Sequence, residues 1–149
     1  MNKEEFKKIA KEIFTSSGLS KKGNYFYSIS NDLICVVGLQ KSNYSEAFYI
    51  NIGFVLKELR PELVDPKDAD GDVRSRFDIE WDDNLNRGLY DLEKLSESNL
   101  GMLRRNLESN LEKFIIPIKS INDLKELIGR EPHLLYQTSF KAKQLLGYE

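Results

Sequence analysis

The sequence predicts an α+β fold in which residues 1–149 form a single domain: an N-terminal helix, an antiparallel meander of three to four strands, and C-terminal helices packed on that sheet. Apolar residues recur at helical spacing near the N-terminus and again beyond residue 90, whereas residues between about 24 and 81 follow strand patterns. The connections between those strands are short, which favours antiparallel pairing. Strands and helices do not alternate, which argues against a doubly wound parallel sheet.

The first element is an amphipathic helix over residues 3–17. Lysine and glutamate separate its apolar side chains, which are Phe6, Ile9, Ala10, Ile13 and Phe14. Gly18 follows at a position suited to end the helix. One face of this helix must be covered, and the sheet that comes next supplies the cover.

Three strands are expected after the helix. Residues 24–30 are rich in aromatic residues that favour strands, and a turn at Asn31 and Asp32 follows. Residues 33–39 are continuously apolar, as in a central strand covered on both faces. A loop over residues 41–45 then leads to a third strand at 46–56.

The clearest alternation begins after an acidic loop at residues 57–71 that contains Pro61 and Pro66. Two sets of side chains point to opposite faces of a half-buried strand: Val73, Ser75, Phe77, Ile79 and Trp81 on one, and Arg74, Arg76, Asp78, Glu80 and Asp82 on the other. The second set predicts a wholly ionic outer face.

The helical C-terminal part, about residues 91–146, starts with one long helix. Its apolar stripe consists of Leu100, Leu103, Leu107, Leu111, Phe114 and Ile118. Pro117 ends this helix because its ring disfavours helical geometry in the preceding residue.

Two shorter helices complete the prediction. Ser120 and Asp123 resemble a capping box that opens a helix ending at Gly129. Pro132 is suited to the first turn of a last helix that runs to about Leu146.

Composition restricts the function classes. The net charge is −2 and the pI is near 5.6, so the chain lacks the basic surplus of a general nucleic-acid binder. We expect a cytoplasmic protein without a membrane span, because no apolar run approaches ~18 residues and no signal peptide is evident. Charge is uneven, however: residues 1–23 carry a net +3 and residues 57–84 a net −5. These are either two solvated faces or a polar docking surface for a protein partner, with the acidic 57–84 region as its centre.

Residues that typically carry chemistry are sparse, so we expect neither a catalytic residue nor a cofactor nor a metal. Cys35 lies inside an apolar strand, which indicates a buried thiol rather than a nucleophile. His133 is the one histidine, and a surface or capping role suits it better than catalysis. Residues 68–72 copy the first half of a calcium loop, but Val73 and Ile79 replace the glycine and glutamate that such a loop requires. A solvated acidic turn is the expectation there.

Two positions on the last strand are candidate binding residues. Arg74 and Arg76 share a face and could form a fork for an anion or carboxylate. The alternative is that they pair across strands, or with Asp78 and Glu80. Trp81 near the strand end is either an interface anchor or the edge of the core.

A second candidate cluster lies around the loop at 41–45. Asn51 shares a strand face with Tyr49, and across the hairpin Ser42 or Gln40 could bond its amide. The cluster is either a structural polar clasp or a small recognition pocket. Lys41, beside the turn, is expected to be exposed in both cases.

Four features in order carry a family resemblance: the helix that ends at Gly18, and residues 24–27, 39–42 and 48–53. On these the chain resembles an uncharacterised bacterial family, the domain-of-unknown-function family forty-three-oh-four. The resemblance covers about residues 3–80, and Arg76 is a further match. It implies no established activity, cofactor or catalytic residue, and proteins of this kind are often found among toxin-immunity and accessory genes.

Two functions fit these observations. The first is a non-enzymatic protein-binding module, such as an immunity-type or accessory protein, that binds a basic partner through the acidic 57–84 region and Trp81. The alternative is a small-molecule binder or enzyme with a pocket near Asn51 and Arg76, which would appear as a concavity of several hundred cubic ångströms.

Overall fold

The structure, a computed structural model, describes residues 1–79 and 88–148. Its longer helices and its strands are α1 (Lys3–Ser16), β1 (Ser20–Lys22), β2 (Tyr25–Ile29), β3 (Leu33–Lys41), β4 (Ala47–Leu56), β5 (Val73–Arg76), β6 (Leu89–Asp91), α2 (Leu100–Phe114), α3 (Ile121–Arg130) and α4 (Phe140–Leu146). Short 3-10 helices lie between them: η1 (Asp68–Asp70), η2 (Leu92–Lys94), η3 (Glu97–Asn99) and η4 (Pro132–Gln137). None of the helices in the described part of the chain has the length and apolar character needed to cross a membrane.

The strands form one antiparallel meander in the order β1-β2-β3-β4-β5, and β6 pairs with the part of β4 beyond β5. The predicted α+β class and meander are therefore confirmed, with six described strands instead of three to four. The two additional strands, β1 and β6, have three residues each, which is too short for an alternating pattern to show.

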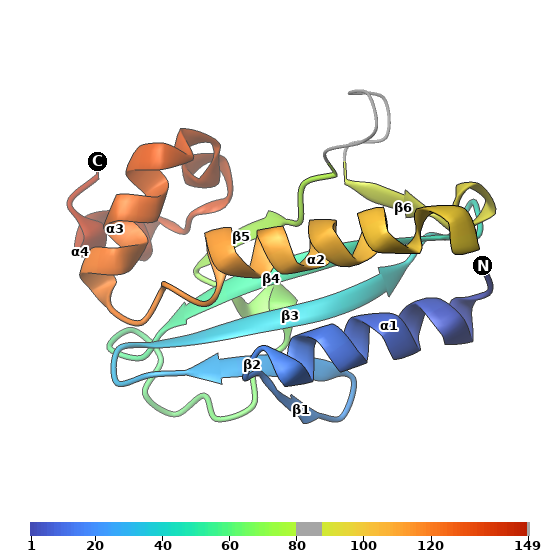
Figure 1. The fold of residues 1–149 in the computed structure, drawn as a ribbon. Coiled ribbons are helices and arrows are strands. Elements are labelled where there is room, and N and C mark those ends of the chain that lie inside the picture. The colour runs from blue at the N-terminus through green and yellow to red at the C-terminus, as the bar shows by residue number, and fades with distance from the viewer. Residues whose placement is uncertain (80–87, 149) are drawn as a thin grey trace.

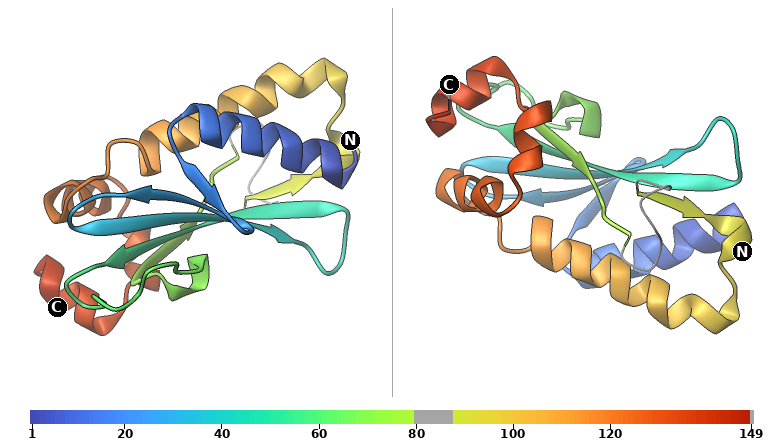
Figure 2. Two further views of the ribbon diagram at one scale, coloured as in Figure 1. Left: turned by 90° about the horizontal axis from the view of Figure 1, so that it is seen from below. Right: turned by 90° about the horizontal axis from the view of Figure 1, so that it is seen from above.

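Helices α1 and α2 cover one face of the sheet, as Figures 1 and 2 show. Alternate side chains of the strands enter the core on this face. Phe6 of α1 stacks on Phe48 of β4 with ring centroids 5.1 Å apart, and Phe14 meets Phe26 edge-on at 5.0 Å. Asn2 caps the first turn of α1, and Gly18 follows its end with a φ of 101° that favours glycine.

Residues 57–72, here called the crossing segment, return across the opposite face of the sheet. They pack directly on β4: a Cβ added to Gly53 would lie 2.5 Å from the Asp68 carbonyl oxygen. Asp72 is buried and accepts a hydrogen bond from the Leu56 amide at 2.9 Å, and its other oxygen lies 3.5 Å from Arg60. The expected solvated turn is therefore wrong at Asp72, because its carboxylate anchors the crossing segment to the end of β4.

The C-terminal elements differ in detail from the prediction. The helix expected from Pro132 to Leu146 is divided into η4 and α4, because the Ser139 side chain caps the start of α4 by accepting a hydrogen bond from the Ala142 amide. The capping box of Ser120 and Asp123 at the start of α3 is present. Helix α3 includes Gly129, which was expected to end it, and continues to Arg130.

Strand β5 ends at Arg76, although the predicted alternation of buried and exposed residues continues as far as Asp78. Buried amides of α2 hold the chain beyond this point: Asn110 accepts a hydrogen bond from the Asp78 amide at 2.8 Å, and both Asn106 and Asn110 donate to the Asp78 carbonyl oxygen. The predictions made for Glu80, Trp81 and Asp82 lie outside the described residues.

Candidate functional site

A cavity of about 1190 Å³ extends along both sides of the sheet, from α1 to the face that η1 and η4 approach. Residues of α1, all strands from β1 to β5, η1 and η4 line it. Figure 2 shows η1 and α4 on the side of the sheet away from α1 and α2, and the β3–β4 hairpin extends past them. Pairing between β2 and β3 stops at Tyr25 and Gly38, so β3 from Leu39 onward pairs with β4 alone. This leaves an open edge of β3, here called the notch, through which the cavity continues to α1.

The centre of the cavity holds a chain of polar contacts across three strands. Asn51 on β4 donates through its amide to Gln40 Oε1 on β3 at 2.8 Å. Its carbonyl oxygen accepts a hydrogen bond from Arg76 Nε on β5 at 3.0 Å. The Arg76 guanidinium carbon lies 3.8 Å from the centre of the Tyr49 ring, a cation–π contact. The predicted clasp of Asn51 is thus present, with Gln40 rather than Ser42 as the partner.

Register explains why these side chains meet. Asn51 lies opposite Gly38 on β3 and Arg76 on β5, and Gln40 lies opposite Tyr49. Alternate residues of a strand point to one face, so Gln40, Asn51 and Arg76 all leave the sheet on the side away from α1 and α2.

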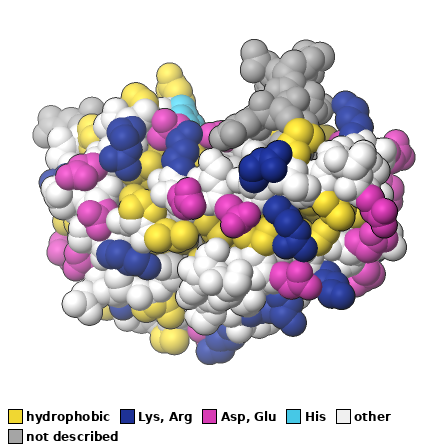
Figure 3. Space-filling model, viewed as in Figure 1, with side chains coloured by type: hydrophobic (Ala, Val, Ile, Leu, Met, Phe, Trp, Pro, Cys, Tyr) yellow, Lys and Arg dark blue, Asp and Glu magenta, His cyan; other side chains and the backbone are white. Residues whose placement is uncertain are grey.

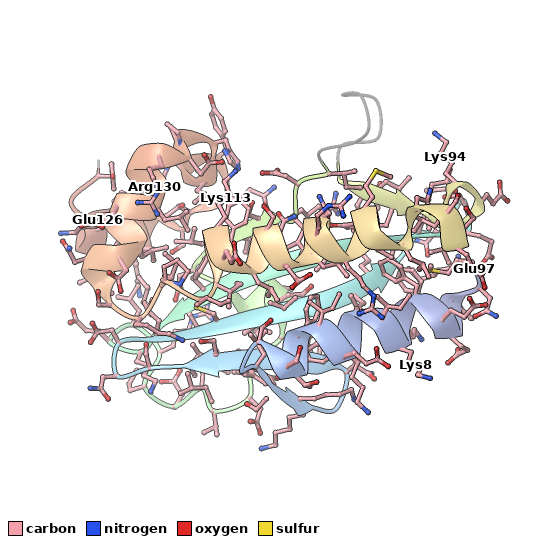
Figure 4. All side chains as sticks on the ribbon, in the orientation of Figure 1. Lys8, Lys94, Glu97, Lys113, Glu126 and Arg130 are labelled. Atoms are coloured by element: carbon pink, nitrogen blue, oxygen red, sulfur yellow. The ribbon has the colours of Figure 1, made fainter. Side chains whose placement is uncertain are left out.

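Arg74 and Arg76 form no ion pair within the described part of the chain. The carboxylate of Asp78, one of the two partners considered from sequence, lies instead 3.2 Å from Lys113 Nζ at the end of α2. Lys113 also lies 2.9 Å from Glu131, and Figure 4 shows it directed toward the C-terminal elements. Burial lowers the pKa of Lys113, but its hydrogen bonds to the carboxylates of Glu131 and Asp78, and their negative charges, outweigh burial and raise it overall. Asp78 is therefore paired with Lys113 and forms no ion pair with Arg74 or Arg76.

The lining of the cavity is strongly basic. Seven of its described side chains are Lys or Arg, and two are Asp or Glu. Besides the arginines, the cations are Lys41 at the end of β3, and Lys7, Lys8, Lys11 and Lys21 from α1 and β1. On the face shown in Figure 3, by contrast, acidic and basic side chains are interspersed. The fold thus concentrates positive charge at one site of a protein whose net charge is −2.

Tyr25 and Asp68 occupy the middle of the cavity wall, close to Gly38. A Cβ at Gly38 would lie 3.0 Å from Asp68 Oδ2 and 3.1 Å from the Tyr25 ring, so the glycine leaves room for both. Burial raises the pKa of Tyr25, and the negative charges of Asp68 and Asp70 raise it further. The Tyr25 hydroxyl therefore stays protonated and available as a donor.

Five of the eight residues selected from sequence line this cavity, namely Gln40, Lys41, Asn51, Arg74 and Arg76. Tyr49 contributes indirectly by supporting Arg76. Ser42 bonds to Tyr44 and Ser45 within the hairpin loop and takes no part. Trp81 is outside the described residues. Binding by any of them remains a prediction.

The cavity lining also includes the lysines of α1, Tyr25, Asp68 and, from η4, Tyr136, none of which was predicted as a binding residue from sequence. The lysines resemble the ordinary solvent face of an amphipathic helix, and Figure 4 shows Lys8 directed away from α2. The signal that could have found Tyr25 and Asp68 is the pair Gly38 and Gly53, glycines within apolar strands that indicate a close approach by another segment.

Cys35 and His133 are the other two residues of the described ranges whose side chains often carry chemistry. Cys35 is 1% exposed, and burial raises the pKa of its thiol to about 12. The His133 side chain lines the cavity from η4, is exposed, and forms no hydrogen bond within the described residues. No group of three His, Cys, Asp or Glu in the described ranges is placed to hold a metal ion.

The fold and the site define a small α+β protein with a basic cavity that extends from the α1 side of an antiparallel meander, past the open edge of β3, to the opposite face of the sheet. The sequence profile of the family described as Domain of unknown function (DUF4304) matches residues 10–121. The chain belongs to this family, as the resemblance at residues 3–80 indicated. No curated protein and no solved structure matches the chain significantly.

Proposed function

We propose that this protein is a non-catalytic binding module that holds an anionic group of its ligand at Arg76 and Arg74. The observation that carries this proposal is the arrangement of Arg76. Asn51 bonds its Nε, and Tyr49 supports its planar face, while its two terminal nitrogens have no partner within the described residues.

Preorganisation makes this arrangement favourable for binding. A free arginine loses side-chain entropy when it captures a ligand, whereas Arg76 is already fixed by two neighbours. Its free nitrogens can donate two parallel hydrogen bonds to a carboxylate or phosphate. Arg74, two residues away on the same face, adds a second positive charge.

The acidic region at 57–84 offers a weaker alternative surface. Several of its described carboxylates are already engaged within the protein: Asp65 lies 2.8 Å from Lys22, Asp70 accepts a hydrogen bond from the Lys67 amide, and Asp72 is buried against β4. These contacts favour a structural role for the acidic residues, and they favour the cavity over this region as the binding site.

Thermal unfolding in the presence of anions tests the proposal. Inorganic phosphate, citrate and glutamate at millimolar concentration should raise the melting temperature, because a ligand that binds the folded state stabilises it by mass action. Arg76→Gln should abolish the shift. Arg130→Gln is the matched control: Arg130 is an exposed arginine on α3 outside the cavity lining, so its loss changes net charge equally.

Arg76→Lys separates charge from geometry. Lysine keeps the positive charge but cannot offer the planar fork, so it should recover only part of the shift. The proposal fails if no anion stabilises the wild-type protein, or if Arg76→Gln and Arg130→Gln lose the shift equally.

A further inference from the structure

We propose that the natural occupant of the cavity is an extended acidic segment of a partner protein. This inference rests on the anion-binding function proposed above and adds the class of ligand. It comes from the length of the cavity, the position of its charges, and the polar groups between them.

The cavity is longer than a single small anion. Lys21 on β1 and Arg74 on β5 both line it, and these strands are separated by four strand spacings. At about 4.8 Å per spacing the two ends are at least about 19 Å apart, because Lys21 also lies on the α1 side of the sheet, and an extended chain needs about six or more residues to join them. A small dicarboxylate or a single phosphate would contact one end only.

Positive charge is concentrated at the two ends of this path. Arg74 and Arg76 form one end, and the lysines of α1 and β1 form the other. Asp68 lies between them, over Gly38 on the central strand β3. A nucleic acid carries a phosphate at every step and would place negative charge against Asp68, whereas a peptide can have acidic residues at both ends and a neutral residue in the middle.

The groups along the path match a peptide backbone. Gln40 uses its side-chain oxygen to hold Asn51, so its amide nitrogen is a donor without a partner in the described part of the chain. At the notch, the backbone amide of Ser42 donates to the Ala47 carbonyl oxygen, so the backbone groups of even-numbered β3 residues face β4. The backbone groups of Leu39 and Lys41 therefore face the open edge. An extended segment passing from α1 to the sheet face would meet these groups, as in other strand-edge recognition.

Fluorescence anisotropy with labelled peptides tests the inference on the full-length protein. Hexaglutamate, triglutamate and the peptide Glu-Glu-Ala-Ala-Glu-Glu, which has neutral residues in the middle, are compared with a six-nucleotide oligothymidylate at one fixed ionic strength. The proteins are the wild type, Arg76→Gln, the double variant Lys8→Gln/Lys11→Gln, and Arg130→Gln as control. Circular dichroism confirms that each variant is folded, and the four substituted side chains are all exposed.

Both six-residue peptides should bind at least about tenfold more tightly than triglutamate, because only they reach both ends of the cavity. The peptide with a neutral middle should bind at least as tightly as hexaglutamate, because it places no carboxylate against Asp68. Arg76→Gln should weaken binding of all three peptides. The α1 double variant should weaken hexaglutamate by about fivefold or more and leave triglutamate nearly unchanged. Arg130→Gln should alter neither.

Each contrary result has a distinct meaning. Equal affinity for triglutamate and the six-residue peptides, with binding still dependent on Arg76, would overturn the extended-segment inference and leave the anion site standing. Tighter binding of oligothymidylate, lost in the same variants, would identify a nucleic acid as the occupant and also overturn it. Absence of binding by every probe, together with absence of thermal stabilisation by anions, would reject the proposed function itself.

Discussion

Gly53 is one of the positions on the sheet against which the crossing segment packs. Replacement by alanine would bring a methyl group to 2.5 Å from the Asp68 carbonyl oxygen, and backbone on both sides limits relaxation. We expect Gly53→Ala to lower the free energy of unfolding by about 1–3 kcal/mol, the usual cost of overpacking. Urea unfolding followed by circular dichroism measures it.

Gly129→Ala is the control for this substitution. A Cβ at Gly129 meets nothing within 4 Å, and the residue lies inside α3 with ordinary helical geometry. Alanine there should increase stability by up to about 1 kcal/mol because glycine is a poor helix former. Similar destabilisation by both substitutions would show that the crossing segment is not packed on Gly53 as described.

Cys35 gives a pH prediction of definite sign. Burial raises the pKa of its thiol from 9.0 to about 12, so above pH 9 the unfolded chain loses this proton while the folded chain keeps it. The contribution of Cys35 to stability is complete below pH 9 and decreases between pH 9 and 12 by up to about 1.4 kcal/mol per pH unit.

Urea unfolding of the wild type and of Cys35→Ala at pH 8, 9 and 10 isolates this effect from the titration of lysines and tyrosines. The difference in unfolding free energy between the two proteins should decrease by about 1.4 kcal/mol from pH 8 to pH 10. Parallel pH profiles would mean that the thiol is accessible to solvent in the folded protein.

At the scale of elements, α2 fixes the chain beyond β5 through buried amides. Asn110 satisfies both the amide and the carbonyl oxygen of Asp78, and it is 3% exposed. Asn110→Ala should therefore lower the unfolding free energy by about 2 kcal/mol, since it removes both bonds and leaves the Asp78 amide without its partner, while Asn106 still donates to the Asp78 carbonyl oxygen.

Asn122→Ala is the matched control in urea unfolding, because Asn122 is an exposed residue of α3 whose side-chain amide donates a hydrogen bond to the Glu126 carboxylate on the helix surface. We expect a change within about 0.5 kcal/mol. Amide hydrogen exchange at Asp78 should also become faster in Asn110→Ala. Unchanged exchange at Asp78 would contradict its anchoring by α2.

Elements with a strong period were predictable from sequence. The apolar spacing of α1 and the alternation around Val73 were enough to place a helix and a strand, because burial on one face imposes a period on the sequence. Strands β1 and β6 were not predictable because three residues contain no period. The division between η4 and α4 depends on a cap at Ser139, which the pattern of apolar residues does not reveal.

The candidate site was predictable only in part, for a related reason. The contact of Asn51 with Gln40 follows from a hairpin, where neighbours in sequence determine neighbours in space. The contribution of Asp68 depends on the path of the crossing segment, and that of α1 depends on where β2 begins. Those are properties of tertiary packing, so individual lysines appeared to be ordinary solvent-facing residues.

At the scale of the whole molecule, the location of charge matters more than its sum. The protein carries a net charge of −2, which opposes long-range attraction of acidic partners. The cavity nevertheless gathers seven Lys and Arg residues from segments that span residues 7–76. Recognition of an anion must therefore depend on the local field of the cavity, which acts over about 8–10 Å at moderate ionic strength.

Salt dependence distinguishes local field from net charge. Raising NaCl from 50 to 500 mM should weaken hexaglutamate binding to the wild type by at least about tenfold, because screening reduces the attraction between charged groups. Arg76→Gln and Arg130→Gln each remove one positive charge, but only the first removes it from the cavity. At low salt Arg76→Gln should bind markedly more weakly and show a smaller dependence on NaCl, while Arg130→Gln should follow the wild-type curve. If the binding curves of both variants shifted equally from that of the wild type, binding would reflect net charge alone, and the cavity would not be the binding site.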